Sequence, residues 1–238
     1  MKHWSEISND PNHPEVRHYL KQNLLERRKA RISDTYEFLR GFVRDQRVLD
    51  IGVVAHTSDR THDTHWKHGV ICSEARRVVG IDIVEDAITN LQERGFDVRL
   101  MDATSEECLD EKFDRVVCGD VIEHVNDPQK LLTFVKRHLR EDGLALITTP
   151  NPFFVSTLMS SIRQGVFIAN AQHISWITPS LAVELGHRSG LELKAYHHTQ
   201  GDGKTPLRKI AVNCLEAFDM RDAELFSGSF YYIFGHKS

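Results

Sequence analysis

The sequence predicts an open, doubly wound α/β fold, in which a mostly parallel sheet carries helices on both faces. Three observations support this prediction. Short apolar segments recur along the chain, amphipathic helical segments alternate with them, and the last two strand-like segments follow each other without a helical segment between them. Alternation of this kind indicates βαβ units, whose crossover helices cover both faces of the sheet.

Residues 1–45 precede the first expected strand and are predicted to form a helical segment. Pro14 suits the first turn of a helix, and apolar side chains recur every four residues from Val16 to Leu24. This pattern predicts helix from residue 12 to residue 42. The many arginine and lysine side chains of this segment are expected to form a solvated face.

The rest of the chain reads as strands and helices in order. Residues 84–95 are expected to form a helix that ends at Gly95, and residues 126–143 a helix with Asp127 as a cap and Pro128 in its first turn. The last two strands are expected to pair antiparallel at one edge of the sheet. The expected strands are 47–52, 78–83, 97–101, 114–119, 144–149, 191–198 and 228–236.

Composition and charge limit the classes of function. The formal net charge of -4 argues against broad, charge-driven binding to nucleic acid. No apolar run approaches the roughly 20 residues of a membrane span, and the first ten residues lack an apolar signal core, so we expect a cytoplasmic protein. The four cysteines form no C-x-x-C pair, which favours reduced thiols over zinc or disulfide sites.

Acidic residues stand at the ends of successive strands, where ligands bind in open α/β sheets. Asp82 is suited to accept hydrogen bonds from a ribose diol, although dinucleotide enzymes use the same device. Asp102 is suited to accept one from the exocyclic amine of an adenine, beside the small Ala103. Each acid alone is equally consistent with a solvated loop carboxylate or a helix cap. The full set of strand-end residues is Asp50, Gly52, Asp82, Asp102, Gly119 and Asp120.

The segments VLDIG, VVGIDI, MDA, FDRVVCGDVIEHVNDP and LREDGLALITTPNP, in this order, resemble those of class I S-adenosylmethionine-dependent methyltransferases. The resemblance runs from about residue 45 to 152 and continues more weakly to about 193. It implies a Rossmann-like, seven-stranded sheet with an antiparallel C-terminal strand, and S-adenosylmethionine as cofactor. The implied contacts are Asp50 and Gly52 near the methionine part, Asp82 on the ribose, Ile83 on the cofactor, Asp102 and Ala103 at the adenine, and Gly119 and Asp120 along the other side.

The loop after the first strand departs from the family pattern. Val54 and His56 stand where the family usually has its second and third glycines, which implies a different path for the loop. A dinucleotide pyrophosphate needs close approach of the backbone, whereas S-adenosylmethionine has no phosphate. The departure therefore weakens a nicotinamide oxidoreductase hypothesis most. It leaves open a methyltransferase-like binding subunit without catalytic activity.

A second group of residues indicates either a metal site or a base. The run DVIEH places Asp120, Glu123 and His124 on one side of a helical turn, and QHISWITP adds His173. The group is similar to the metal site of small-RNA 2′-O-methyltransferases, and EHVNDP is similar to a run in ubiquinone-biosynthesis O-methyltransferases. Two hypotheses stay open. All four residues bind a divalent metal, or His173, with His124 and Asp120, serves metal-free catalysis.

The leading hypothesis is S-adenosylmethionine-dependent methyl transfer to a small-molecule acceptor, most simply to a hydroxyl oxygen. The alternatives are the silent binding subunit and RNA 2′-O-methylation, which the acidic charge disfavours. Residues 46–238 are expected to form the methyltransferase domain. Within it, the apolar stretch 153–180 is expected to be either a packed helix and loop or a lid over the substrate. No pattern specifies an oligomeric state.

Overall fold

The computed structural model describes residues 2–54, 63, 65–200 and 224–237. Seven strands form one sheet in the order β3-β2-β1-β4-β5-β7-β6, so the predicted doubly wound fold is confirmed. Each expected strand is present. The strands are β1 (Arg47–Ile51), β2 (Arg77–Asp82), β3 (Val98–Leu100), β4 (Phe113–Gly119), β5 (Leu139–Pro150), β6 (Leu191–Gln200) and β7 (Ser227–His236).

Strand directions divide the sheet into two parts. Strands β3, β2, β1, β4 and β5 are parallel, as crossover helices require. Strand β7 runs antiparallel to both β5 and β6 and lies between them, which confirms the predicted pairing of the last two strands. The register sets Tyr232 of β7 opposite Ile147 of β5 and Tyr196 of β6. Strand β6 therefore forms the edge of the sheet.

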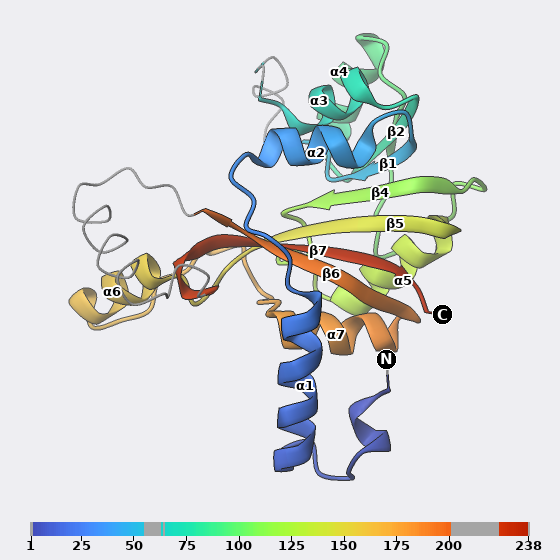
Figure 1. Cartoon of the computed structure of the whole chain (residues 1–238). Helices are drawn as coiled ribbons and strands as arrows, with labels where there is room; N and C mark the ends of the chain where they lie inside the picture. Colours follow the sequence, from blue (N-terminus) through green and yellow to red (C-terminus); the bar gives the residue numbers. More distant parts are fainter. Residues whose placement is uncertain (1, 55–62, 64, 201–223, 238) are drawn as a thin grey trace.

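Helices cover both faces of the sheet (Figure 1). On one face, α2 and α3 pack against Val48, Val117 and Leu146, and on the other face α5 and α7 cover a larger apolar core that includes Val116 and Ile147. The helices are α1 (Pro14–Arg27), α2 (Thr35–Val43), α3 (Lys67–Glu74), α4 (Glu85–Glu93), α5 (Pro128–His138), α6 (Val155–Gln164) and α7 (Pro179–Arg188), with 3-10 turns at η1 (Trp4–Glu6) and η3 (Glu224–Phe226).

Local signals at the helix ends act as predicted. The Asp127 carboxylate accepts hydrogen bonds from the backbone amides of Gln129 and Lys130 and so caps α5, and Pro128 occupies its first position. Gly95 follows α4 with a φ of 86°, a left-handed conformation that glycine adopts without strain. The end of α5 differs from its prediction: the helix stops at His138 and not at residue 143, because β5 begins at Leu139.

The N-terminal segment differs from its prediction. Helix α1 begins at Pro14 as expected, but residues 28–34 are not helical. They run beside the edge strand, where Arg28 and Ile32 form bridges with Tyr196 and Thr199 of β6. A new helix, α2, then starts under the cap of Asp34. The prediction of continuous helix from 12 to 42 is therefore wrong, because pairing with β6 satisfies this backbone better than a helix would.

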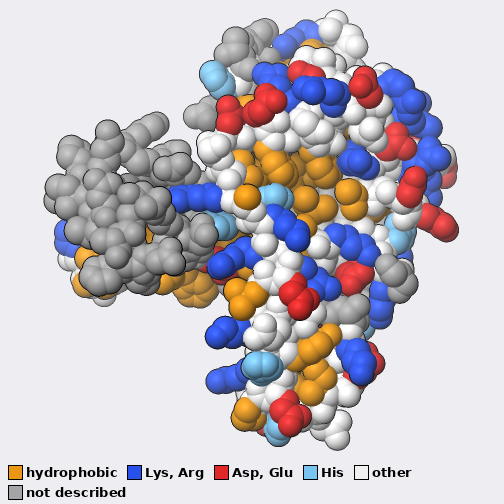
Figure 2. Space-filling model, viewed as in Figure 1, with side chains coloured by type: hydrophobic (Ala, Val, Ile, Leu, Met, Phe, Trp, Pro, Cys, Tyr) orange, Lys and Arg blue, Asp and Glu red, His pale blue; other side chains and the backbone are white. Residues whose placement is uncertain are grey.

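The surface agrees with the modest net charge. Figure 2 shows acidic and basic side chains interspersed across the viewed face, with an apolar area below α2 over strands β4 and β5. Within the described part of the chain, no helix has the length and apolar character required to span a membrane.

Candidate functional site

A cavity of about 710 Å³ opens at the carboxyl ends of β1, β2 and β4, the edge at which open α/β sheets bind ligands. Every residue predicted for the site lines this cavity except Asp50. The structure thereby brings together residues from five segments of the sequence. They are Gly52, Asp82, Ile83, Asp102, Ala103, Gly119, Asp120, Glu123, His124 and His173.

Asp82 fixes the backbone of the loops that follow β1 and β2. Its Oδ1 accepts hydrogen bonds from the backbone amides of Ile83 (2.7 Å) and Val84 (3.1 Å), and its Oδ2 accepts one from Val54 (2.9 Å). Each carboxylate oxygen has further lone-pair capacity. Asp82 lines the cavity while its backbone partners fix its orientation, which fits the acceptance of hydrogen bonds from a diol.

Asp102 stands at the other end of the same wall. Its Oδ1 accepts from the backbone amide and hydroxyl of Thr104, at 2.7 Å and 2.8 Å, and its side chain is exposed. Ile83, 70% exposed, and the buried Ala103 line the cavity with it. An exposed carboxylate beside small and apolar surfaces fits an adenine ring with its exocyclic amine.

The glycine that the first turn retains is required by packing. Gly52 has a φ of 83°, and a Cβ at this position would lie 2.3 Å from Cγ2 of Val121. Val54, at the place of the second family glycine, lines the cavity and donates its amide to Asp82. His56 lies outside the described residues. The altered turn therefore still brings its backbone to Asp82.

Asp50 has a different position from the one predicted. Its carboxylate is 4% exposed and lies 2.8 Å from Nδ1 of His68, which is 1% exposed. Burial lowers the pKa of His68, but the hydrogen bond to Asp50, with smaller contributions from Cys72, outweighs it and raises the pKa to about 9. Asp50 and His68 thus form a buried ion pair beneath the cavity.

Asp120 is part of a polar group on the cavity wall. Its Oδ2 lies 2.6 Å from Nζ of Lys67, its Oδ1 accepts from the Thr148 hydroxyl at 3.0 Å, and its φ is 58°. Burial lowers the pKa of Lys67, but the charge of Asp120 and the hydrogen bond between them raise it overall. Asp120 therefore interacts with an ammonium group instead of joining the two histidines.

Glu123, His124 and His173 form the group that the sequence predicted, without Asp120. The potential ligand atoms of these three side chains lie within 4.8 Å of one another, and the two imidazole rings meet edge to face at 4.8 Å. The backbone carbonyl of Glu123 accepts from the amides of Ile174 and Ser175, which draws the segment carrying His173 to the end of β4. Two segments 50 residues apart in sequence therefore share one site.

The Glu123 side chain is buried without compensation. It is 2% exposed, and no described group donates a hydrogen bond to either carboxylate oxygen. Burial, with a contribution from the charge of Asp120, raises its pKa to about 7, because the nearby Glu123 amide, the Thr149 hydroxyl and the charge of Lys67 offset the burial only in part. Buried carboxylates are normally hydrogen-bonded or paired. The arrangement fits a group that receives a proton, a cation or a polar ligand from the cavity.

The sequence analysis assigned no role to Lys67 and did not predict the pairing of His68 with Asp50. Lys67 and His68 both lie on α3, next to the buried Trp66, whose indole donates to the backbone carbonyl of Val53 at 2.7 Å. The run THWKHG contains the relevant signal, since a helix that follows the first turn of such a sheet directs its first residues to the ligand edge. Sequence spacing alone does not show that Lys67 reaches Asp120, 53 residues further on.

A methyltransferase domain model matches residues 24–196. The chain belongs to this methyltransferase family. The sheet order, the reversed β7 and the acidic strand ends are those expected of its class I S-adenosylmethionine-dependent members, as the sequence resemblance implied.

Several curated relatives of this methyltransferase-family chain are ubiquinone biosynthesis O-methyltransferases. Over 117 residues it is 36% identical to the ubiquinone biosynthesis O-methyltransferase of Rickettsia prowazekii, which covers 47% of this chain and 46% of the relative. The chain spans about half the length of the first curated relatives that it matches.

Solved structures share the fold of this methyltransferase-family chain. An S-adenosylmethionine-dependent methyltransferase from Archaeoglobus fulgidus matches with a TM-score of 0.57 and 17% identity, over 93% of this chain and 99% of that one. The N-methyltransferase NodS of Bradyrhizobium japonicum, solved with S-adenosyl-L-homocysteine, matches with a TM-score of 0.52 and 15% identity, over 97% and 94%. At these identities the likeness concerns the fold alone.

Proposed function

We propose that the protein transfers the methyl group of S-adenosylmethionine to a hydroxyl oxygen of a small-molecule acceptor. One observation carries the proposal: the diol-type and adenine-type acids and the Glu123, His124 and His173 group line the same cavity. The name of the Rickettsia relatives as O-methyltransferases supports oxygen as the methylated atom. In this proposal residues 46–238 are the methyltransferase domain and residues 1–45 an N-terminal segment that contains α1 and α2.

The proposal gives each wall of the cavity a role in binding. Asp82 holds the ribose hydroxyls, with Ile83 against the sugar and base, while Asp102 and Ala103 hold the adenine. Gly52, Gly119 and Asp120 face the amino-acid end. Asp50 supports the turn from below through His68. When bound, S-adenosylmethionine supplies an electrophilic methyl group on a positively charged sulfur.

The histidines handle the proton in this proposal. An acceptor hydroxyl next to His173 gives its proton to the His173 imidazole as the hydroxyl oxygen gains the methyl group. The His124 ring meets the His173 ring edge to face and orients it. Asp120, which interacts with Lys67 and Thr148, helps to position the cofactor and does not take up the proton.

A divalent metal is the second candidate for this step. Glu123, His124 and His173 offer one buried carboxylate and two imidazoles within 4.8 Å, a donor set that suits manganese, iron or zinc. Their fit rests on the Glu123 oxygens, which receive no hydrogen bond from the described residues. A metal there would lower the pKa of a coordinated hydroxyl. Asp120 of the predicted set is outside this group.

The segment 153–180 is proposed as the substrate lid. It carries His173, and α6 within it has no buried residue; Met159 is 59% and Ile162 74% exposed. A packed structural helix buries one face, so this exposure supports a covering role over an acceptor with an apolar portion.

The decisive experiment measures cofactor binding and turnover in matched variants. Calorimetric titration with S-adenosylhomocysteine should show binding by the parent protein and at least about tenfold weaker binding by Asp82→Ala, because a buried hydrogen bond to a charged group is lost. His173→Ala should retain the affinity and lose at least about 100-fold in methyl transfer to a panel of phenolic hydroxyl acceptors. Asp86→Ala, on the exposed face of α4, is the control.

Other outcomes decide between the alternatives. Absence of S-adenosylhomocysteine binding would establish a silent binding subunit. Methylation of RNA with no transfer to small acceptors would identify RNA as the substrate. Loss of turnover in a chelator, restored by a divalent ion, selects the metal. Activity that is indifferent to the chelator selects His173 as the base.

A further inference from the structure

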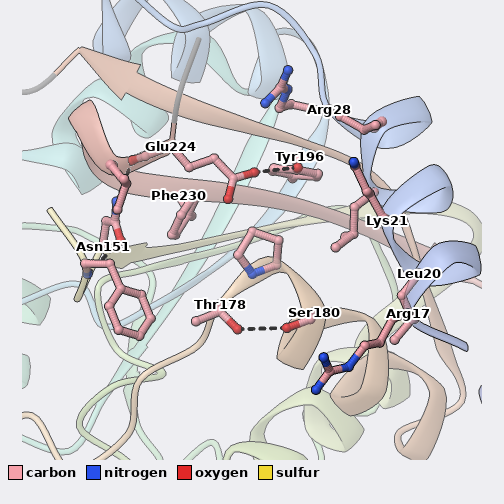
Figure 3. A pocket seen from close by; sticks show the side chains of 15 residues that line it. Arg17, Leu20, Lys21, Arg28, Asn151, Thr178, Ser180, Tyr196, Glu224 and Phe230 are labelled. Atoms are coloured by element: carbon pink, nitrogen blue, oxygen red, sulfur yellow. Dashed lines mark hydrogen bonds between the residues drawn. The ribbon is translucent and has the colours of Figure 1, made fainter. Parts of the chain in front are cut away.

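A second cavity, of about 890 Å³, lies away from the cofactor cavity and shares no lining residue with it. It lies between α1, the start of α7 and the adjoining parts of β6 and β7 (Figure 3). Pro150 lines the first cavity and Asn151 the second, so the end of β5 separates them. The second cavity is lined by Arg17, Leu20, Lys21, Leu24, Leu25, Arg28, Asn151, Phe153, Thr178, Pro179, Ser180, Tyr196, Glu224, Leu225 and Phe230.

Most of the wall of this cavity is apolar. Leu20 of α1 and Phe230 of β7 lie on opposite sides of it in Figure 3, and Leu24 and the ring of Tyr196 also line it. At the mouth, Phe153 is 53% exposed. Apolar surface left in contact with water is unfavourable by roughly 25 cal/mol per Å². A concave apolar wall of this size therefore favours an apolar ligand.

Basic side chains border this apolar wall on one side. Arg17 and Lys21 stand one helical turn apart on α1, and Arg28 stands at its C-terminal end. Among the described residues, Arg17 and Lys21 take part in no ion pair, whereas Arg27 of the same helix pairs with Glu192 at 3.4 Å. Two exposed cations at the rim of a cavity attract a negative charge.

The lining carries three basic side chains and one acidic side chain, so positive charge is in excess there. Glu224 is the acid among the lining residues, and its Oε1 already accepts the hydroxyl of Tyr196 at 2.7 Å. Thr178 and Ser180, at the start of α7, place their hydroxyl oxygens 3.1 Å apart at the cavity wall (Figure 3). Hydroxyls and a guanidinium donate to carboxylate and phosphate oxygens.

We propose that this second cavity binds an amphipathic anion, with its apolar chain or ring against Leu24 and Phe230 and its carboxylate or phosphate at Arg17 and Lys21. The apolar wall supplies affinity and the basic rim supplies selection for a negative head. The two cavities share no lining residue, so the proposal does not rest on methyl transfer, although Phe153, Thr178 and Ser180 belong to the segment 153–180 proposed as the lid.

The test uses three probes with the same twelve-carbon chain: dodecanoate, dodecyl phosphate and neutral dodecanol, each below its micellar concentration. Calorimetric titration of the full chain should detect binding of at least one anion, at least about tenfold tighter than dodecanol. Tighter binding of one anion over the other identifies the head group. Equal binding of all three probes, or binding of none, overturns the proposal.

Matched variants locate the binding. Arg17→Glu/Lys21→Glu should weaken the preferred anion at least about tenfold and leave dodecanol unchanged. Ser180→Trp, an exposed position at the cavity wall, should weaken the anion by filling the space. Lys29→Glu/Lys130→Glu makes the same change in charge at exposed positions outside the cavity and should bind as the parent does.

Each variant must keep the parent's S-adenosylhomocysteine affinity and melting temperature, which separates loss of the site from loss of the fold. If the rim variant misfolds, Ser180→Trp decides alone. Anion binding that survives Ser180→Trp, or that falls equally in the control pair, places the ligand elsewhere and overturns the proposal.

Discussion

Two buried carboxylates at the same edge of the sheet have opposite surroundings. Asp50, at the end of β1, is 4% exposed and is paired at 2.8 Å with the imidazole of His68. Glu123, after β4, is 2% exposed and receives no hydrogen bond from any described group. The cavity is lined by Glu123 and not by Asp50. A buried carboxylate that is paired with a cation, such as Asp50, stabilises the structure. A buried carboxylate without a hydrogen-bond donor beside a cavity, such as Glu123, is available to a ligand.

The largest change in stability is expected when Asp50 loses its imidazole partner. His68→Leu leaves a buried carboxylate unpaired, so the free energy of unfolding should fall by about 3–5 kcal/mol. Urea denaturation at pH 7 measures the change. His18→Leu, at an exposed position on α1, should change it by less than about 0.5 kcal/mol. A small loss in His68→Leu would show that Asp50 is neutral in the folded protein and would end the comparison.

The same pair predicts the pH dependence of stability. The folded pKa of His68, about 9, lies above its ordinary value of 6.5, so the pair stabilises the protein fully below about pH 6.5 and loses this contribution as the pH rises through about 9. The difference in unfolding free energy between the parent and His68→Leu should therefore shrink from pH 6 to pH 10. A constant difference over this range would contradict the ion pair.

A smaller effect of opposite sign is expected at Glu123. Its folded pKa of about 7 exceeds the ordinary 4.5, so ionisation destabilises the fold as the pH rises from about 4.5 to about 7. Glu123→Gln should become more stable than the parent by on the order of 2 kcal/mol above pH 7, and match it near pH 4. Thermal unfolding with a chelator present measures this. Parallel pH curves for the two proteins would show that Glu123 is compensated in solution.

The smallest effect is expected at the half-exposed pair of Lys67 and Asp120. Their side chains are 42% and 43% exposed, so solvent screens their attraction. Lys67→Met should change the unfolding free energy by less than about 1 kcal/mol, with Lys130→Met as the exposed control. A loss comparable to that of His68→Leu would mean that compensation by charge does not depend on burial at this edge.

The sequence predicted the sheet because its signals are local. Apolar runs such as 47–52 and 114–119, the cap at Asp127 and the glycine at Gly95 each specify an element within a few residues, and the structure has these elements. The strand-end candidates, such as Gly52, Asp82 and Asp102, followed from the rule that parallel strands bring their carboxyl ends to one edge. His173 lies at no strand end and was implied by the family resemblance. Prediction was thus reliable where the fold class alone determines proximity.

The features that the sequence did not predict depend on pairs distant along the chain. The role of Asp50 is set by His68, which reaches it from a helix on one face of the sheet. Asp120 precedes Glu123 by three positions. Its left-handed φ and its ion pair with Lys67 nevertheless place its carboxylate away from Glu123 and the two histidines. The charged residues and the serine of segment 28–34 are compatible with a helix, but the segment instead forms bridges with β6. Each outcome needs tertiary contacts that no local pattern contains.

The interior position of β7 has a consequence for biosynthesis. Strand β5 leaves the ribosome with one side unpaired, and the side of β6 that faces β7, away from its bridges to Arg28 and Ile32, has no partner until residues 227–236 arrive between the two strands. The nascent chain therefore exposes two open strand edges until its last elements emerge, and such edges invite association with other chains. We expect chaperone demand during translation to be concentrated in this half of the sheet, while the β1–β4 half folds earlier.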